Sequence, residues 1–167
     1  MRKIIPSAIV LVLLLQPAIS QTSEWIRFTP KGGNFVVMLP SQPKEDVSVK
    51  ENFTTHLYTV SAGKAIFLIG FGEYAPGVRI DPQKELEANR DNFNLGLKAT
   101  LLTSKTYDMD GRPALEFTSE TQQVNLRSRV FLVGNRVIQL ATLVYKGYDE
   151  SQNVDKFLDS FAFISQN

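Results

Sequence analysis

The stretch of this chain that decides its fold is residues 107–139, YDMDGRPALEFTSETQQVNLRSRVFLVGNRVIQ. Two dipeptides in it, Asp110-Gly111 and Gly134-Asn135, are typical of two-residue β-hairpin turns, because residues that tolerate a positive φ match the twist of the paired strands. Apolar and polar residues alternate on both sides of these turns, as they do in strands with one face in the core. The stretch therefore predicts consecutive antiparallel strands.

Counting outward from these two turns, with Gln122-Gln123 taken as a third two-residue loop, predicts the register of four strands near residues 99–108, 112–121, 124–133 and 136–146. One face then carries two polar rows. The first row is Lys105, Glu116 and Arg129, and the second is Thr103, Thr118, Arg127 and Thr142. The opposite face is apolar and should receive a helix; it carries Leu115, Phe117, Val130, Leu132 and Val137.

Two helices are expected, one before and one after these four strands in the sequence. Asp81 before Pro82 is a helix start with a capping side chain, and this helix should run to about Lys98. The second helix follows the capping candidate Asp149 and places its apolar residues at helical spacing; they are Val154, Phe157, Leu158 and Phe161.

The segment before the first helix predicts further strands at residues 25–28, 35–39, 47–49 and 56–60. The nearly continuous apolar run Ala65 to Phe71 predicts a strand that is buried on both faces, and Gly70-Phe71-Gly72 loosens its end. The predicted fold class is α+β, with a central antiparallel β-sheet packed with helices.

Residues 1–20 have the pattern of a secretory signal peptide, with a basic start at Arg2 and Lys3, an apolar core, and small residues before Ser20. The core is about a dozen residues long, short of the roughly twenty that cross a bilayer. We expect cleavage near Ser20, a single domain over residues 21–167, and a periplasmic or extracellular location.

Charge and composition narrow the choice of partners. Removal of the signal peptide with Arg2 and Lys3 leaves 16 of the 18 basic residues and all 17 acidic ones, so the net charge of the mature chain is about −1. Neither basic runs nor a basic face is found, which argues against a nucleic-acid partner. The chain has no cysteine for acylation or disulfides, and no later apolar run is long enough for an integral membrane span in the mature chain.

The residues of common catalytic and metal sites are sparse. His56 is the single histidine, and its alternation with Tyr58 is typical of an ordinary strand residue. The run Asp108-Met109-Asp110-Gly111 resembles the opening of a calcium loop but lacks the later ligands, so a hairpin turn is favoured. The sequence therefore predicts no catalytic residue, no metal site and no cofactor. One alternative stays open, a carboxylate-dependent envelope hydrolase that uses Glu116 and Glu120 on one predicted face.

The candidate contacts for a ligand or partner are charged residues of the polar sheet face, namely Arg112, Glu116, Arg127 and Arg129. Alternating charges flanked by threonines form either a solvated cross-strand ladder or a surface that recognises polar groups. The leading hypothesis is a non-enzymatic binding or accessory protein of the cell envelope, whose partner is an unknown protein or a small polar ligand. A purely structural envelope component is the third possibility.

Several local patterns resemble one family over most of the mature chain. They include the segment from Trp25 to Pro40 with Gly32-Gly33, the hairpin Gly111-Arg112-Pro113-Ala114-x-Glu116-Phe117, the stretch Arg129 to Arg136, and Phe157-Leu158-x-Ser160-Phe161. Together they resemble small exported bacterial proteins with the PsbP-like fold, named after an extrinsic subunit of photosystem II. The resemblance implies an α/β/α sandwich around an antiparallel sheet, found mostly in non-enzymatic accessory or binding proteins. With one histidine the chain lacks an obvious counterpart to a histidine-based metal site, so no functional residue is carried over.

Overall fold

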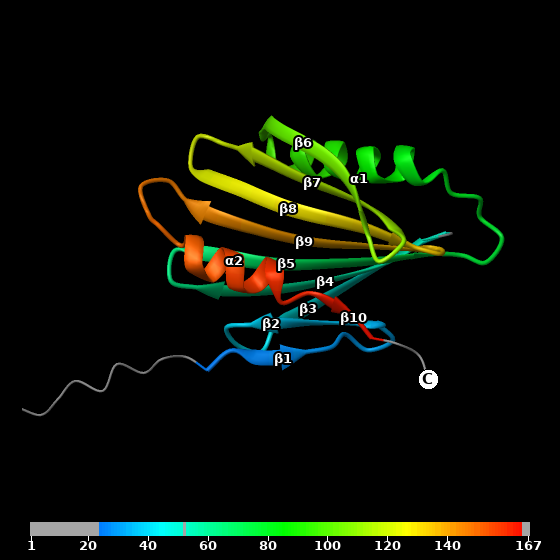
Figure 1. The fold of residues 1–167 in the computed structure, drawn as a ribbon, viewed down its shortest axis with the longest axis horizontal. Helices are drawn as coiled ribbons and strands as arrows, with labels where there is room; N and C mark the ends of the chain where they lie inside the picture. Colours follow the sequence, from blue (N-terminus) through cyan, green and yellow to red (C-terminus); the bar gives the residue numbers. More distant parts are fainter. Residues whose placement is uncertain (1–23, 52, 165–167) are drawn as a thin grey trace, which may run out of the picture.

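The computed structural model describes residues 24–51 and 53–164. The predicted signal peptide and its cleavage site lie outside these residues. In the described part, the elements follow one another as β1 (Ile26–Phe28), β2 (Phe35–Leu39), β3 (Lys44–Lys50), β4 (Phe53–Ala62), β5 (Ala65–Tyr74), α1 (Pro82–Leu97), β6 (Thr100–Met109), β7 (Arg112–Glu120), β8 (Val124–Val133), β9 (Arg136–Tyr145), α2 (Ser151–Asp159) and β10 (Ala162–Phe163) (Figure 1).

Strands β3 to β9 of the described chain form one antiparallel sheet in the order β3-β4-β5-β9-β8-β7-β6. The hairpin turns are those predicted from the sequence. Asp110 and Gly111 both have a positive φ, of 54° and 75°, and Gly134 has a φ of 61°. Both polar rows are confirmed, because Glu116 pairs with Lys105 and Arg129, while Arg127 pairs with Thr118 and Thr142.

Helix α1 covers one face of this sheet over β7 and β8, as the apolar face predicted (Figure 1). Asp81 caps it by accepting a hydrogen bond from the Lys84 amide, and Pro82 is its first residue. The contact is apolar; its buried residues are Leu86, Leu115, Phe117, Val124, Leu126, Val130, Leu132, Val137 and Leu143. Helix α1 leaves the β4–β5 side of the same face less covered.

The opposite face is covered by α2 together with a second, smaller sheet of order β1-β2-β10 (Figure 1). Phe35, Val37 and Leu39 of β2 and Phe157 of α2 share one buried cluster with the inward side chains of β4, β5 and β9. The expected antiparallel sheet is thus confirmed, but the fold is richer in strands than a sheet packed between helices, because a small sheet that was not predicted shares one layer with α2.

Three local predictions were wrong. The second helix ends at Asp159, so Phe161 is buried beyond it rather than on its last turn, and the N-cap is Glu150 instead of Asp149. Asp149 accepts a hydrogen bond from the Ser151 amide just before the helix. Strand β5 is fully buried on one face only, since Ile66, Leu68 and Gly70 on the α1 side are half-buried.

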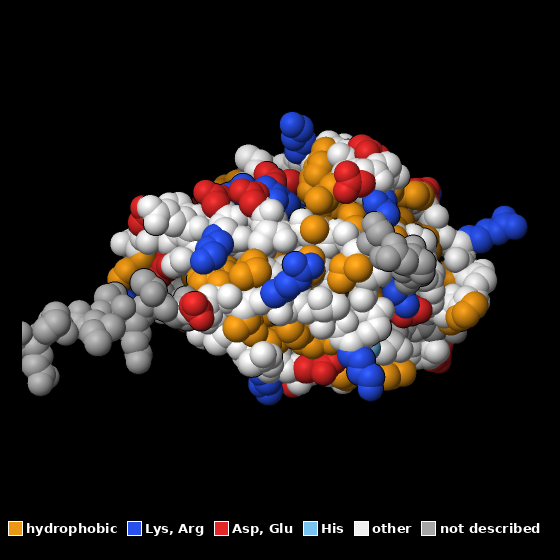
Figure 2. All heavy atoms as spheres, turned by 60° about the horizontal axis from the view of Figure 1, so that its bottom comes forward, with side chains coloured by type: hydrophobic (Ala, Val, Ile, Leu, Met, Phe, Trp, Pro, Cys, Tyr) orange, Lys and Arg blue, Asp and Glu red, His pale blue; other side chains and the backbone are white. Residues whose placement is uncertain are grey.

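Among the described residues, none of the helices combines the length and apolar character needed to cross a membrane. Figure 2 turns the side of the small sheet toward the viewer. On that face Lys and Arg side chains are scattered among Asp, Glu and uncharged groups. Charge there is mixed, in keeping with the near-neutral composition of the chain.

Candidate functional site

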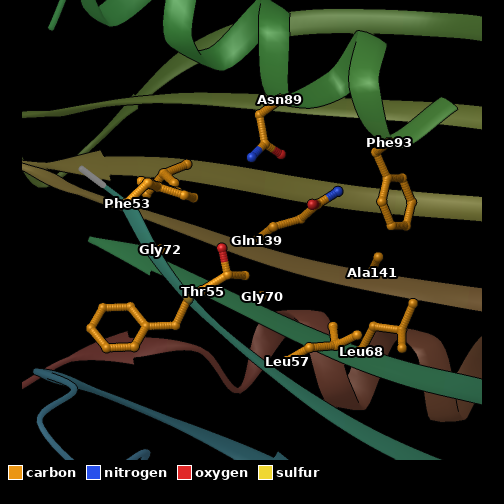
Figure 3. Close-up of a pocket in the computed structure, with 12 residues that line it drawn as sticks. Phe53, Thr55, Leu57, Leu68, Gly70, Gly72, Asn89, Phe93, Gln139 and Ala141 are labelled. Carbon is orange, nitrogen blue, oxygen red and sulfur yellow. The ribbon is translucent and has the colours of Figure 1, made fainter. Parts of the chain in front are cut away.

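The incomplete cover of α1 leaves a slot between this helix and strands β4, β5 and β9 (Figure 3). The slot has a volume of about 250 Å³. Asn89 and Phe93 of α1 form one wall, while β4, β5 and β9 provide the floor and the other wall. Most of the lining is apolar; the strand residues are Phe53, Thr55, Leu57, Leu68, Gly70, Phe71, Gly72, Val137, Gln139 and Ala141.

Two glycines of β5 line the slot. A Cβ at Gly70 would lie 3.6 Å from the Gln139 Cβ, an ordinary contact, so the floor there is open. A Cβ at Gly72 would overlap the ring of Phe53, which lies directly over this glycine. Glycine in a strand often marks a place where another group approaches closely. Here Gly72 receives an aromatic ring and Gly70 leaves space.

Gln139 presents a hydrogen-bond acceptor on the floor of the slot. Its Nε2 donates to Ser128 Oγ at 3.0 Å, and Ser128 Oγ donates to the backbone oxygen of Leu140 at 2.8 Å. Because the serine proton is used on Leu140, the serine oxygen must accept from the glutamine amide. These two hydrogen bonds fix the orientation of the Gln139 side-chain amide. Its Oε1 is therefore the atom that can accept a hydrogen bond from another donor.

Asn89 points from α1 toward Gln139 across the slot (Figure 3). Its Oδ1 is shielded from solvent and receives no hydrogen bond from any described residue. A buried polar atom without a partner costs about 1–3 kcal/mol, and native proteins contain few of them. Three other such atoms occur in the described part of the chain, on Asn34, Asn94 and Ser119. Of the four, only Asn89 lines this slot.

The end of β5 is tied to α1 at Tyr74, two residues beyond Gly72. Tyr74 donates its hydroxyl proton to the Glu85 carboxylate, whose two oxygens both lie 2.9 Å away. Burial and this hydrogen bond raise the pKa of Tyr74 to about 12, so the hydroxyl is neutral near pH 7. The Tyr74 ring also lies against Phe53, with centroids 4.5 Å apart. These contacts hold α1 at a fixed distance from the slot floor.

The charged residues predicted as ligand contacts lie on the other face of the sheet, beside α2. Arg129 reaches three groups there: Nε contacts Glu116 at 2.7 Å, one terminal nitrogen donates to the Leu158 backbone oxygen at 2.9 Å, and the other contacts Asp159 at 2.9 Å. Its side chain is 19% exposed. Arg129 therefore anchors the C-terminal end of α2 to the sheet.

The other predicted contacts also have partners within the molecule. Arg127 pairs with Asp155 of α2 at 2.6 Å, and the Arg112 guanidinium lies 4.2 Å from the centre of the Phe163 ring. The structure thus brings Glu116, Arg127 and Arg129 together under α2 and places Arg112 at β10. Recognition of a ligand or partner by these four residues stays a prediction.

A second hollow of about 410 Å³ lies next to the β6 edge and includes Glu116 and Arg129 in its lining, with Lys105, Tyr107 and Met109. Both carboxylates of the alternative hydrolase hypothesis face this side of the sheet and are held by cations, Glu116 by Arg129 and Glu120 by Lys146 at 2.7 Å. Both carboxylates are therefore engaged in ion pairs within the molecule. In the described residues no group of three or more His, Cys, Asp or Glu side chains could hold a metal ion.

The sequence resemblance predicted a PsbP-like sandwich of helices around an antiparallel sheet, and the structure has a large antiparallel sheet with α1 on one face and α2 plus the small sheet on the other. The structure is similar to the solution structure of cyanobacterial PsbP (CyanoP) from Synechocystis sp. PCC 6803, with a TM-score of 0.61 and 10% sequence identity. The match covers 90% of this chain and 98% of that chain. The resemblance is confirmed, and at this identity it shows the fold alone.

Other comparisons add little. A crystal structure of a protein from Bacteroides thetaiotaomicron VPI-5482 matches with a TM-score of 0.37 and 12% identity, over 84% of this chain and 48% of that chain. This likeness carries no argument. Neither a protein-family model nor a curated protein matches the sequence.

The sequence interpretation missed the slot. Its residues come from four elements, and their meeting depends on where α1 crosses the sheet. Two signals were present in the sequence: Gly70 and Gly72 interrupt the apolar run of β5, and Asn89 interrupts the apolar stripe of α1. Taken alone, each of these residues only weakened the sequence pattern of its own strand or helix. In the structure all three line the slot.

Proposed function

We propose that this chain is an exported, non-enzymatic binding domain of the cell envelope, built on the PsbP-like sandwich, and that it holds a small molecule in the slot beside α1. One observation carries the proposal. None of the described residues that line the slot is ionisable, while one of them, Asn89, has a buried amide oxygen that receives no hydrogen bond from any described residue. An apolar pocket with a few convergent polar groups is the usual form of a ligand site.

The chemistry of the lining favours recognition over catalysis. The polar groups of the slot are the amides of Asn89 and Gln139 and the hydroxyl of Thr55. Such groups donate and accept hydrogen bonds but do not exchange protons with a substrate near neutral pH. A ligand in this slot is therefore bound and oriented, and it leaves chemically unchanged.

Substitution of Gly70 by valine tests this proposal. The new Cβ meets only Gln139 at an ordinary distance, and valine suits a strand, so we expect the fold to persist while the branched side chain fills the slot floor. Binding of a panel of neutral, anionic and cationic one-ring and two-ring compounds is measured by ligand-observed NMR. We expect compounds that bind the native protein to bind Gly70→Val at least about tenfold more weakly, or about 1.4 kcal/mol.

The matched control is Gly96→Ala, a glycine substitution on the exposed side of α1 with no atom within 4 Å of the new Cβ. It should leave binding unchanged. Equal binding to the native protein and to Gly70→Val, or conversion of a bound compound into a product, would contradict the proposal.

A further inference from the structure

The polar groups of the slot define the kind of hydrogen bond that a ligand must make. The orientation of Gln139 is fixed by its bond to Ser128, which leaves Oε1 as an acceptor. Asn89 adds a second, unpartnered oxygen on the opposite wall (Figure 3). Both residues line the slot, and their amide oxygens have no donor among the described residues, so a ligand with an N–H or O–H donor complements them.

The same groups exclude ligands that carry charge. An anion in the slot would face the oxygens of Asn89 and Gln139, and none of the described lining residues is a cation that could pair with it. A cation would lose its water shell in an apolar space whose described lining offers no carboxylate. Since an unpaired charge is costly to bury, the ligand should be neutral.

The size of the slot limits the ligand further. A dry apolar cavity of about 150 Å³ accepts one benzene ring, so a slot of about 250 Å³ suits a molecule of one or two rings. Phe53 and Phe93 flank the space with aromatic rings. Flat apolar rings pack well against such side chains.

Resting on the proposed binding function, we infer that the ligand of the slot is a neutral molecule of one or two rings that donates a hydrogen bond to Asn89 Oδ1 or Gln139 Oε1. This places the slot in the class of sites for phenols, indoles and similar uncharged aromatic compounds.

Three probes of nearly the same shape test this inference: indole, 1-methylindole, which lacks the N–H donor, and indole-2-carboxylate, which adds a negative charge. Each is titrated into the isotope-labelled protein, and backbone amide shifts in β5, β9 and α1 report binding at the slot. We expect indole to bind about 2- to 10-fold more tightly than 1-methylindole, as one net hydrogen bond allows, and more tightly still than the carboxylate.

The variant Asn89→Leu removes the unpartnered amide and keeps a similar size. It should erase most of the preference for indole over 1-methylindole without abolishing the binding of either. Asn94→Leu is the matched control, because Asn94 is on the same helix with an unpartnered oxygen and does not line the slot. Its preference for indole should match that of the native protein. If Asn89→Leu does not fold, Gln139→Met takes its place.

The outcomes distinguish a wrong ligand class from a wrong binding site. If all three probes shift the slot amides equally, or the carboxylate binds best, the slot is a site but the inferred ligand class is wrong. The class is also wrong if Asn89→Leu keeps the full preference. If none of the probes shifts amides around the slot up to its solubility limit, the proposed function itself loses its site.

Discussion

Replacement of Phe157 by alanine is expected to lower the free energy of unfolding by about 3–5 kcal/mol. Phe157 of α2 is fully buried and lies edge-on to Phe67 of β5, with ring centroids 5.3 Å apart. With Val154 and Leu158 it is one of the α2 residues in the buried cluster shared by the large and small sheets. Because hydrogen-bonded strands on either side cannot collapse into the space, most of the cavity should persist.

Urea unfolding followed by fluorescence and circular dichroism measures this loss. Leu95→Ala is the control, since Leu95 is 76% exposed and its truncation should change stability by no more than about 0.5 kcal/mol. A loss below about 1 kcal/mol for Phe157→Ala would show that α2 does not close the core as described.

Replacement of Arg129 by methionine is expected to cost about 1–3 kcal/mol. The change removes the contacts to Glu116, Asp159 and the Leu158 backbone oxygen, while the apolar stem can still pack. The expected loss of stability is modest because Asp159 is 65% exposed, so water screens its ion pair with Arg129. Hydrogen exchange should rise first in the last turn of α2.

Arg127→Met is the matched control on the same strand. Arg127 makes one ion pair to Asp155, and both side chains are about one third or more exposed, so we expect a cost below about 1 kcal/mol. Neither arginine variant should weaken indole binding at the slot on the other face. Equal costs for the two variants, or loss of indole binding in either, would contradict the assignment of these residues to the anchoring of α2.

The register of four strands could be predicted from the sequence because two of the connecting loops have two residues, and in the third Thr121 pairs with Val124 across Gln122-Gln123. Once Asp110-Gly111, Gln122-Gln123 and Gly134-Asn135 are placed, the pairing of Glu116 with Arg129 and of Arg127 with Thr142 follows by counting. The apolar face under α1 follows from the same alternation. Local rules therefore fixed most of the large sheet.

Contacts between distant segments could not be predicted in this way. Strand β10 has only two residues, which is too short for a strand pattern in its own sequence. Its partner β2 lies more than a hundred positions earlier, so local sequence does not indicate the pairing. The polar face was predicted as a recognition surface because neither periodicity nor charge tells where α2 docks. The slot exists because α1 crosses the sheet at an angle that leaves β4 and β5 partly uncovered. The local sequence pattern does not predict this crossing angle.

The central claim is that a neutral ligand binds in the slot beside α1, and not at the charged residues under α2. The most direct test is a crystal structure of the protein with 5-bromoindole, in which the anomalous signal of bromine locates the ring. We predict a bromine peak between α1 and β5, with the indole N–H within hydrogen-bond distance of Asn89 or Gln139. A bromine site beside Arg129 or elsewhere, with the slot empty, would contradict the claim.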